Sequence, residues 1–375
     1  MKIIHIVENL DKGAVENWLV NIFLESRKIR PDWEWTFYCI LGKPGRLDEN
    51  VRNAGARIIY SPVTVSNKLS FLKYLRIELK SGGYDILHAH HDYLSGFYLL
   101  ASAGIKFKKR LLHIHNTDKS LPVGNKTLHD LLLGPFRKFA IMLSDQVIGI
   151  SKNTLEQFAK RRNVPDDKFI ILYYGINFSR FEGAVQKASI RSEFNLPEHS
   201  KILLYAGRMN QMKNPVFVVE VLARLLRLRS DVYAVFIGQG DEQQMVEQKA
   251  SELGITDHIR ISGWHNNVPA VMKGADVFVF PRKEYPKEGL GLVVVEAQAA
   301  GLPMFITDGI VRDAIVIPEL AHFNDLSDPS AWANQIAEVL DCEAPLPAEQ
   351  ALQRMKQSPF ELARATKNLV DIYEH

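Results

Sequence analysis

The feature that most constrains the fold of this chain is an alternation of short apolar segments with longer amphipathic ones. The short segments are rich in β-branched and aromatic residues, as at Ile3–Val7 and Val277–Phe280. Strands buried on both faces of a parallel sheet are almost continuously apolar, and the helices that connect them cover the sheet with one apolar face. The pattern therefore predicts an α/β fold built on parallel sheets.

The alternation occurs twice, and a polar stretch separates the two series. Residues 177–200 contain Gly183, Pro197 and mixed charges, which are typical of a linker. We expect two α/β halves joined near residue 190, and an amphipathic helix over Phe360–Tyr373. The other predicted strands are Trp35–Ile40, Ile58–Tyr60, Asp85–His90, Leu111–His115, Gln146–Ser151, Ile202–Ala206, Val232–Ile237, Ile259–Ser262 and Met304–Ile306. The other predicted helices are Val15–Ser26, Phe71–Ser81, Val216–Leu228 and Asp241–Leu253.

The composition excludes several classes of protein. Hydrophobic residues make up 46% of the 375 residues and charged residues 24%, which are ordinary globular values. The net charge of +3 is too small to indicate nucleic-acid binding. Cys39 and Cys342 have no metal-ligand spacing and fit a reducing compartment. The first apolar run is too short for a signal peptide, and none approaches the roughly 20 residues of a membrane span. We therefore expect a soluble, cytoplasmic protein.

A pair of basic residues follows the first strand of the second half. The strand Ile202–Ala206 leads to Arg208 and Lys213, and Asn214 and Pro215 are good N-cap and first residues of a helix. Free N–H groups and the helix dipole favour an anion at such a position. The segment predicts a diphosphate site, with two solvated basic residues in a loop as the alternative.

The strongest local signal is the segment from Glu288 to Ala297, with glycines at 289 and 291. Glycines permit close backbone approach to a ligand. If Glu288 and Glu296 both lay on a helix, about 12 Å would separate them. Paired carboxyl groups of glycosidases are only about 5–9.5 Å apart. The two glutamates are therefore predicted to hold distant parts of one long ligand, unless one is a capping residue and the other a surface residue.

The first half carries weaker signals. Gly13 and Glu16 lie where a helix opens after the first strand, so backbone N–H groups there either approach a phosphate or form a simple loop. Neither half contains a complete G-x-G-x-x-G, and the glycines at 238 and 240 are interpreted as a plain turn. Histidines 88, 90, 91, 113 and 115 cluster in or after two strands without an HExxH motif or a cysteine partner. They are expected to be core or hydrogen-bonded residues, with one of them facing an interdomain cleft as the functional alternative.

Together these segments resemble the retaining nucleotide-sugar glycosyltransferases of the GT-B class, which includes sucrose synthase and bacterial capsule and exopolysaccharide enzymes. The E-x7-E motif of that family is matched by Glu288 and Glu296. Its G-R-x4-K diphosphate site is matched by Gly207, Arg208 and Lys213. The resemblance extends over nearly the whole chain.

Further positions of the resemblance are less complete. The segment Ile261–Trp264 is similar to the stretch that meets the nucleobase through its backbone, so Trp264 enters the substrate-binding set. The loop that begins at Gly13 resembles G-G-x-E, with Ala14 in place of the second glycine. His115 is similar to the histidine that lies near the donor sugar. Residues 174–177 resemble N-G-V-D, from which Tyr174 and Asn177 both depart.

The resemblance implies two Rossmann-like domains facing across a cleft. Residues 1–185 would form the acceptor-side domain, residues 186–358 the nucleotide-sugar domain, and residues 359–375 a helix that returns to the first domain. It implies retaining transfer of a hexose from a nucleotide-diphosphate sugar, with no metal and no cofactor. Arg208 and Lys213 would stabilise the leaving diphosphate. Glu288 would bind sugar hydroxyls, Glu296 the ribose, and the backbone N–H groups of Gly289, Leu290 and Gly291 the sugar and phosphate.

The acceptor is expected to be a saccharide or a lipid-linked saccharide in polysaccharide biosynthesis. Two alternatives remain: a nucleotide-sugar epimerase or phosphorylase on the same scaffold, and a non-catalytic sugar-nucleotide-binding protein. A peripheral contact with the inner face of the membrane is a further hypothesis. Residues 106–110 contain four basic residues, and 137–138 and 160–162 add more, each worth about 1 kcal/mol near an anionic surface. The apolar stretch 131–136 would add contact, and a solvated basic face is the alternative.

Overall fold

The computed structural model describes residues 1–11, 13–117, 126–160 and 167–375, and the side chains of 126–133 are also outside its description. The chain divides into two compact units. Unit 1 comprises Met1–Ile176 and Pro359–His375, and unit 2 comprises Asn177–Ser358. The division after Ile176 falls earlier than the expected domain boundary at residue 185.

The sheet of unit 1 is parallel and is ordered β3-β2-β1-β4-β5-β6-β7 in the described residues. The order reverses between β1 and β4, and such switch points are where open α/β sheets bind ligands, at the carboxyl ends of the strands. The strands are β1 (Lys2–Val7), β2 (Glu34–Cys39), β3 (Arg57–Tyr60), β4 (Ile86–Ala89), β5 (Lys109–Ile114), β6 (Gln146–Gly149) and β7 (Phe169–Ile171).

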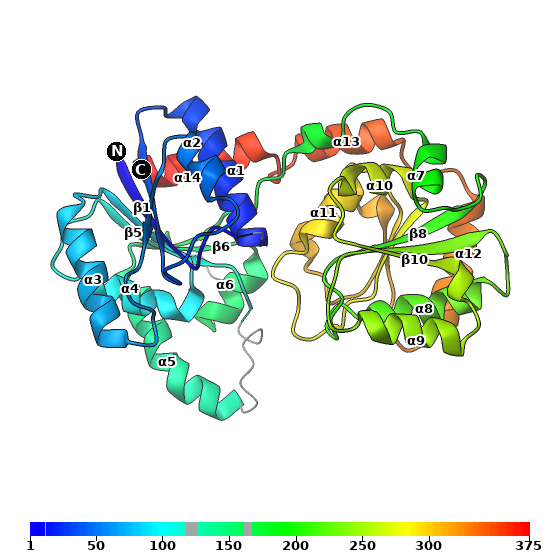
Figure 1. Cartoon of the computed structure of the whole chain (residues 1–375), viewed down its shortest axis with the longest axis horizontal. Coiled ribbons are helices and arrows are strands. Elements are labelled where there is room, and N and C mark those ends of the chain that lie inside the picture. The colour runs from blue at the N-terminus through cyan, green and yellow to red at the C-terminus, as the bar shows by residue number, and fades with distance from the viewer. Residues whose placement is uncertain (12, 118–125, 161–166) are drawn as a thin grey trace. The chain divides into compact units, whose positions relative to one another are not determined.

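Helices pack on both faces of this sheet (Figure 1). The C-terminal helix α14 (Leu362–Glu374) packs against α1 (Ala14–Ile29), and Arg30 Nε lies 2.6 Å from a carboxylate oxygen of Glu374. The chain's last helix thus belongs to unit 1. The other helices are α2 (Asp48–Asn53), α3 (Lys68–Ser81), α4 (Ser95–Ala101), α5 (Lys126–Leu143) and α6 (Lys152–Ala159), with a 3-10 turn at Asp92–Leu94.

Unit 2 repeats the arrangement, with a parallel sheet ordered β10-β9-β8-β11-β12-β13 and a switch point between β8 and β11. Its strands are β8 (Lys201–Ala206), β9 (Val232–Ile237), β10 (Ile259–Gly263), β11 (Val277–Phe280), β12 (Met304–Ile306) and β13 (Ala321–Phe323). Its helices are α7 (Lys187–Glu193), α8 (Pro215–Leu225), α9 (Gln243–Glu252), α10 (Val268–Gly274), α11 (Leu292–Ala299), α12 (Pro329–Asp341) and α13 (Ala348–Lys356), with 3-10 turns at Phe178–Phe181, Thr256–His258, Arg312–Ala314 and Pro318–Leu320.

The predicted α/β class with parallel sheets is confirmed, but the linker interpretation of residues 177–200 was wrong. This stretch contains α7, and Arg191 on that helix is buried with Nη2 2.7 Å from a carboxylate oxygen of Asp276. The same guanidinium donates to the carbonyls of Ser200 and Gly274. A buried charge is retained when it is paired and hydrogen-bonded, so the mixed charges here belong to the packing of unit 2. The short strands β7 and β13 were also missed.

Candidate functional site

The candidate site in unit 2 is built from the loops that follow β8, β9 and β11, at the switch point of the sheet. The loop after β8 carries Arg208 and Lys213 and ends at α8. Asn214 is the N-cap of α8 and Pro215 its first residue, as predicted, but the Asn214 side chain makes no capping bond. The first N–H groups of α8 are therefore not capped by a side chain, which suits them to an anion.

Glycines allow this loop to pack against the loop after β9. A Cβ on Gly238 would lie 2.1 Å from the carbonyl oxygen of Gly207, and one on Gly240 would lie 2.0 Å from that of Met209. Gly207 and Gly238 also have φ of +152° and +124°. The two loops then join through a hydrogen bond from Met209 N to Gln239 O of 3.0 Å. Gly238 and Gly240, which the sequence pattern indicated only as a plain turn, thus allow the close packing that fixes the loop carrying Arg208.

Lys213 is half-buried beside the end of β11. Its Nζ lies 5.4 Å from the centre of the Phe280 ring, and its backbone N–H donates to Asn210 Oδ1 at 3.0 Å. Arg208, by contrast, has an exposed side chain, and its carbonyl accepts a hydrogen bond from the Tyr205 hydroxyl at 3.0 Å. Hydrogen bonds therefore fix the loop backbone at both residues, which follow the carboxyl end of β8.

Glu288 lies in the field of two cations. Its Oε2 is 2.5 Å from Nε of Arg282, a buried residue just after β11, and its backbone N–H donates to Gly309 O at 2.8 Å. Burial by itself would raise the pKa of Glu288, but the charges of Lys213 and Arg282 and the hydrogen bond from Arg282 outweigh burial and lower it. Glu288 is therefore ionised at neutral pH, and an ionised carboxylate is a strong hydrogen-bond acceptor.

Arg282 is a site residue that the sequence analysis missed. It is 6% exposed, and besides Glu288 it donates to the carbonyl of Lys283 and to that of Pro286. Its position directly after a strand at the switch point was the available signal, because the same rule singled out Arg208. Its bonds fix the loop that leads to Glu288.

The helix α11 begins after Glu288, so the two glutamates are not on one helix. Gly291 is the N-cap with φ of +85° and no side-chain cap, and Leu290 is buried at 2% exposure. The 12 Å estimate assumed one continuous helix through both glutamates, and that assumption was wrong. The residues Gly289 to Gly291 instead lead the chain into a helix N-terminus that no side chain caps, where phosphate or sugar oxygens are favoured.

Glu296 lies within α11 and differs electrostatically from Glu288. Burial raises the pKa of Glu296 to about 7, and the charge of Arg180 only partly opposes this shift. At neutral pH its carboxyl group is therefore close to half protonated. Such a group can donate or accept a hydrogen bond, which suits contact with paired hydroxyls.

Trp264 follows β10 and is 61% exposed, an unusual placement for so large an apolar side chain. It lies after a strand on the same edge of the sheet as the β8 and β9 loops. The Gly263 carbonyl accepts a hydrogen bond from Gly238 N at 2.7 Å, which ties the β10 end to the β9 loop. The predicted nucleobase segment is thus connected to the loops of the candidate diphosphate site.

The predicted residues of unit 1 are placed differently. Gly13 is the N-cap of α1, and a Cβ on it would lie 2.0 Å from Glu16 Oε2. Burial raises the pKa of Glu16, and the nearby carboxylates of Glu8 and Asp11 add to this effect while a backbone hydrogen bond opposes it. In this structure the side-chain carboxyl group of Glu16 therefore lies beside the N-terminus of α1. A phosphate contact at Gly13 stays a prediction.

His115 has both ring nitrogens in internal hydrogen bonds. Nδ1 is 2.5 Å from the Tyr174 hydroxyl and Nε2 is 3.0 Å from Nδ1 of His90, and the residue is 5% exposed. The ring therefore has no unused nitrogen for a sugar hydroxyl. Any contact of His115 with a ligand would involve its backbone or the carbon edge of its ring.

Comparison with known proteins assigns the family. The sequence model for glycosyl transferases group 1 matches residues 186–358, and the one for glycosyltransferase family 4 matches residues 31–180. Two parallel-sheet α/β units of this kind are characteristic of the GT-B class. The chain belongs to the GT-B glycosyltransferases, as the resemblance predicted.

Individual proteins are similar over nearly the whole chain. EpsF of Bacillus subtilis is 26% identical over 90% of this chain and 87% of its own length. The UDP-Gal:alpha-D-GlcNAc-diphosphoundecaprenol alpha-1,3-galactosyltransferase of Escherichia coli is 22% identical over 94% of this chain and 92% of its own length. Anabaena HepE, solved in complex with UDP, aligns with a TM-score of 0.79 at 15% identity over 99% of each chain. Among the described helices of this chain, none is long and apolar enough to cross a membrane.

Proposed function

We propose that this protein transfers a hexose from a nucleotide-diphosphate sugar, with retention of anomeric configuration, to a saccharide or lipid-linked acceptor in polysaccharide biosynthesis. The observation that carries the proposal is the placement of Lys213 and the ionised Glu288 at the switch point of unit 2, next to a helix without a side-chain cap. A cation and free N–H groups suit a diphosphate, and a carboxylate suits sugar hydroxyls.

The residues then have distinct roles. As the bond from the sugar C1 to the phosphate oxygen breaks, the electron pair leaves with the nucleoside diphosphate, and Lys213 and Arg208 stabilise the growing charge. The N–H groups at the start of α11 contribute to the same stabilisation. Glu288 accepts hydrogen bonds from the hexose, and Glu296 contacts the ribose. The new bond joins C1 to the acceptor oxygen, whose proton is released.

Relatives guide the choice of substrates. The Escherichia coli relative is named for a UDP-galactose donor and a diphosphoundecaprenol-linked acceptor. HepE was solved with UDP-glucose as well as with UDP. We therefore propose a UDP-hexose as donor and an undecaprenyl-diphosphate-linked saccharide as acceptor. Neither a metal nor a cofactor enters the proposal, since cationic side chains and N–H groups supply the charge that a diphosphate requires.

The direct test incubates the protein with a panel of nucleotide sugars and lipid-linked acceptors and follows products by mass spectrometry. The proposal expects one donor to yield an acceptor longer by one hexose together with free nucleoside diphosphate. An epimerised donor, or release of a sugar phosphate, would instead support the epimerase or phosphorylase alternative. Binding of nucleotide sugar without any product from the full panel would support the non-catalytic alternative.

A peripheral membrane contact is a second, independent part of the proposal. We place this contact on a surface other than the basic run 106–110. In the basic run 106–110, Lys108 Nζ pairs with Asp85 at 3.1 Å, Lys109 donates to Ile372 O, and Arg110 donates to Ile105 O. Much of that run therefore stabilises unit 1. Residues 161–162 of the other predicted basic cluster, and the side chains of 131–133 in the apolar stretch, lie outside the described part of the chain.

Helix α3 offers a better surface for anionic lipid. Its exposed side includes Leu69 at 83% and Ile77 at 53% exposure. The same helix carries the exposed basic residues Lys68, Lys73 and Lys80, whereas Arg76 donates to the carbonyls of Ala101 and Ala103. Apolar side chains surrounded by cations are typical of helices that bind membrane surfaces. We propose that α3 brings unit 1 to a membrane that carries the lipid-linked acceptor.

A further inference from the structure

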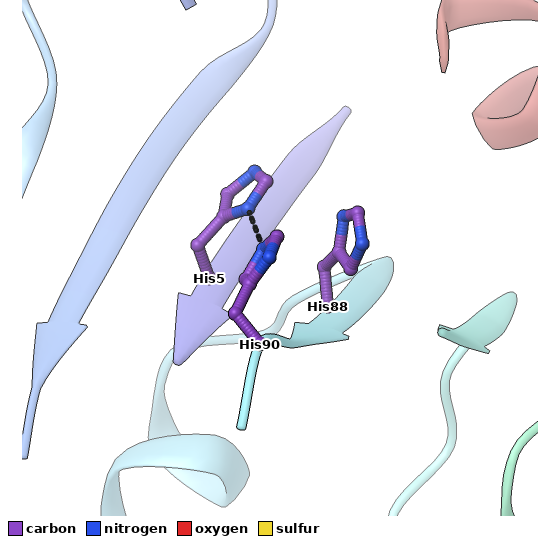
Figure 2. Close-up of side chains that lie close together, drawn as sticks. All are labelled: His5, His88 and His90. Atoms are coloured by element: carbon purple, nitrogen blue, oxygen red, sulfur yellow. Dashed lines mark hydrogen bonds between the residues drawn. The ribbon is translucent and has the colours of Figure 1, made fainter. Parts of the chain in front are cut away.

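Five buried histidines lie on three neighbouring strands of unit 1, at the switch point of its sheet. His5 on β1 is the Cα partner of His88 on β4, and His90 follows two residues later on the same face. Figure 2 shows these three rings gathered between β1 and β4, with His5 bonded to His90. His113 in β5 and His115 just after it continue the cluster, and all five residues are 0–5% exposed.

The ring contacts are edge-to-edge hydrogen bonds. His5 Nδ1 lies 3.0 Å from His90 Nε2, His90 Nδ1 lies 3.0 Å from His115 Nε2, and His88 Nε2 lies 3.2 Å from His113 Nδ1. In each of the three pairs the ring centres are 5.2 Å apart, and the rings are only 19°, 22° and 6° from parallel. Rings so close to one plane, with nitrogens in contact, aim the N–H of one ring at the lone pair of the next.

Two tyrosines join these pairs into one chain. The Tyr373 hydroxyl of α14 is 2.7 Å from His88 Nδ1 and 3.4 Å from His5 Nε2, and the Tyr174 hydroxyl is 2.5 Å from His115 Nδ1. The resulting relay runs in the order Tyr174, His115, His90, His5, Tyr373, His88 and His113. It connects the last helix of the chain to the carboxyl end of β5.

The rings of this relay are neutral, so its donors must all point the same way. Burial lowers the pKa of all five histidines, to about 3 for His5 and His115. A neutral imidazole has one N–H and one acceptor nitrogen, and a tyrosine has one O–H. Each member therefore donates to one neighbour and accepts from the other. Only two orientations of the whole relay satisfy every link.

The ends of the relay select one orientation. If Tyr174 donates, every ring carries its proton on Nε2, and the only unmatched group is the Nε2–H of His113, which has no partner among the described residues. If the relay runs the other way, every ring is protonated on Nδ1. Then both the Tyr174 O–H and the His113 Nε2 lone pair are unmatched within the described residues. Unmatched buried polar groups are costly, so the Nε2–H orientation is favoured.

A metal ion is the rival explanation for such a cluster. Two groups of three histidines each have one ring nitrogen per residue within 4.8 Å of the others. One group is His5, His88 and His90, and the other is His90, His113 and His115. A metal requires these lone pairs to converge on one point, whereas the near-coplanar rings direct them at neighbouring N–H groups. A metal-bound histidine also donates its other nitrogen to a carboxylate or carbonyl group. Among the described residues, none of the five rings is hydrogen-bonded to a carboxylate.

We propose that these seven side chains form one directed relay, and that Tyr174 is a positioning residue whose O–H, donated to Nδ1 of His115, fixes the Nε2–H tautomer of that ring and of the rings beyond it. The relay stands apart from the proposed function.

The test is NMR of the protein labelled with ¹⁵N-histidine, which reports the tautomer of each ring. In the wild type all five rings are expected as neutral Nε2–H tautomers at pH 7, with unchanged signals after Zn²⁺ is added. In Tyr174→Phe the donor to His115 is lost, both orientations of the relay then leave two groups unmatched, and His115 is expected to populate both tautomers. Tyr98→Phe is the matched control, because the buried Tyr98 hydroxyl has no partner in the described structure and lies outside the relay.

Each outcome decides the proposal. Nδ1–H tautomers in the wild type, or a Zn²⁺-induced shift of these rings, would overturn the relay without any need for a variant to fold. An unchanged His115 tautomer in Tyr174→Phe, or the same change in Tyr98→Phe, would overturn the positioning role. If the wild type transfers no sugar, the proposed function fails while the NMR result still judges the relay.

Discussion

At the residue scale, one rule located most of the candidate site from sequence. Polar residues after strands of a parallel sheet meet at one edge, and Arg208 and Lys213 were found in this way. The same rule applied to Arg282, but its partner Glu288 is six residues further along the chain, and a bend in the loop brings them together. The internal bonds of both His115 nitrogens were beyond sequence, because they depend on the register of three strands and on Tyr174 far along the chain.

Lys213→Ala is expected to lower kcat/KM for the nucleotide sugar by about 10- to 150-fold. A hydrogen bond to a charged group is worth about 1.5–3 kcal/mol, and each 1.36 kcal/mol in the barrier is a factor of about ten. Lys249→Ala is the matched control, since Lys249 lies on α9 of the same unit and pairs with Glu252 at 3.2 Å. Steady-state kinetics and thermal unfolding of both variants make the comparison. Wild-type kinetics in a folded Arg208→Ala, Lys213→Ala double variant would exclude this diphosphate site.

At the element scale, most buried strands were predicted closely, whereas several helices were not predicted. The strands Val232–Ile237 and Val277–Phe280 have the predicted bounds, because continuous β-branched and aromatic runs leave no competing structure. Helix α7 was missed because its charged residues resemble a linker, although Arg191 is buried by its pairing with Asp276. Pairing across the fold is invisible in a local pattern.

The sheet of unit 1 is expected to lose stability in mild acid. The pKa of His5 and His115 is lowered by burial from 6.5 to about 3, and that of His91 to about 4. The unfolded chain therefore binds more protons than the folded one below pH 6.5, and stability present above that pH is lost as pH falls. The loss is up to about 1.36 kcal/mol per pH unit for each such histidine.

Urea unfolding at pH 8, 6 and 5 measures this effect through tryptophan fluorescence. Trp18, Trp33 and Trp35 are buried in unit 1 and account for three of the five tryptophans. The urea midpoint should be highest at pH 8 and fall steeply between pH 6 and pH 5. His199→Gln, which removes an exposed histidine of unit 2, should follow the same curve. Equal midpoints at the three pH values would show that the buried rings do not control stability.

Helix α3 should govern binding to anionic vesicles. The double variant Leu69→Glu, Ile77→Glu replaces two exposed apolar residues with negative charges, which anionic lipid repels. Its co-sedimentation with anionic vesicles should therefore drop to near background. Added salt should weaken wild-type binding, because the basic residues act through screened charges. Leu228→Glu, at a 54% exposed leucine of unit 2, should bind like the wild type. Equal binding of the wild type to neutral and anionic vesicles would contradict this surface.

At the scale of the whole molecule, two α/β halves with parallel sheets were predictable, because the alternation of strands and helices repeats along the chain. The division of the chain was less so. The structure separates Met1–Ile176 with Pro359–His375 from Asn177–Ser358, and the isolated bridge between Ile176 and Glu361 brings the two parts of unit 1 together. The family resemblance implied this return of the C-terminus, which the structure shows as packing of α14 on α1.

The central claim is that cationic side chains and helix N–H groups, rather than a metal ion, hold a nucleotide-diphosphate sugar for retaining transfer. The most direct measurement is ¹H NMR of the product formed from an α-linked UDP-hexose in the presence of EDTA. The account predicts an α-linked product, formed at the same rate with and without the chelator. A β-linked product, or activity lost with EDTA and restored by added Mg²⁺ or Mn²⁺, would contradict it.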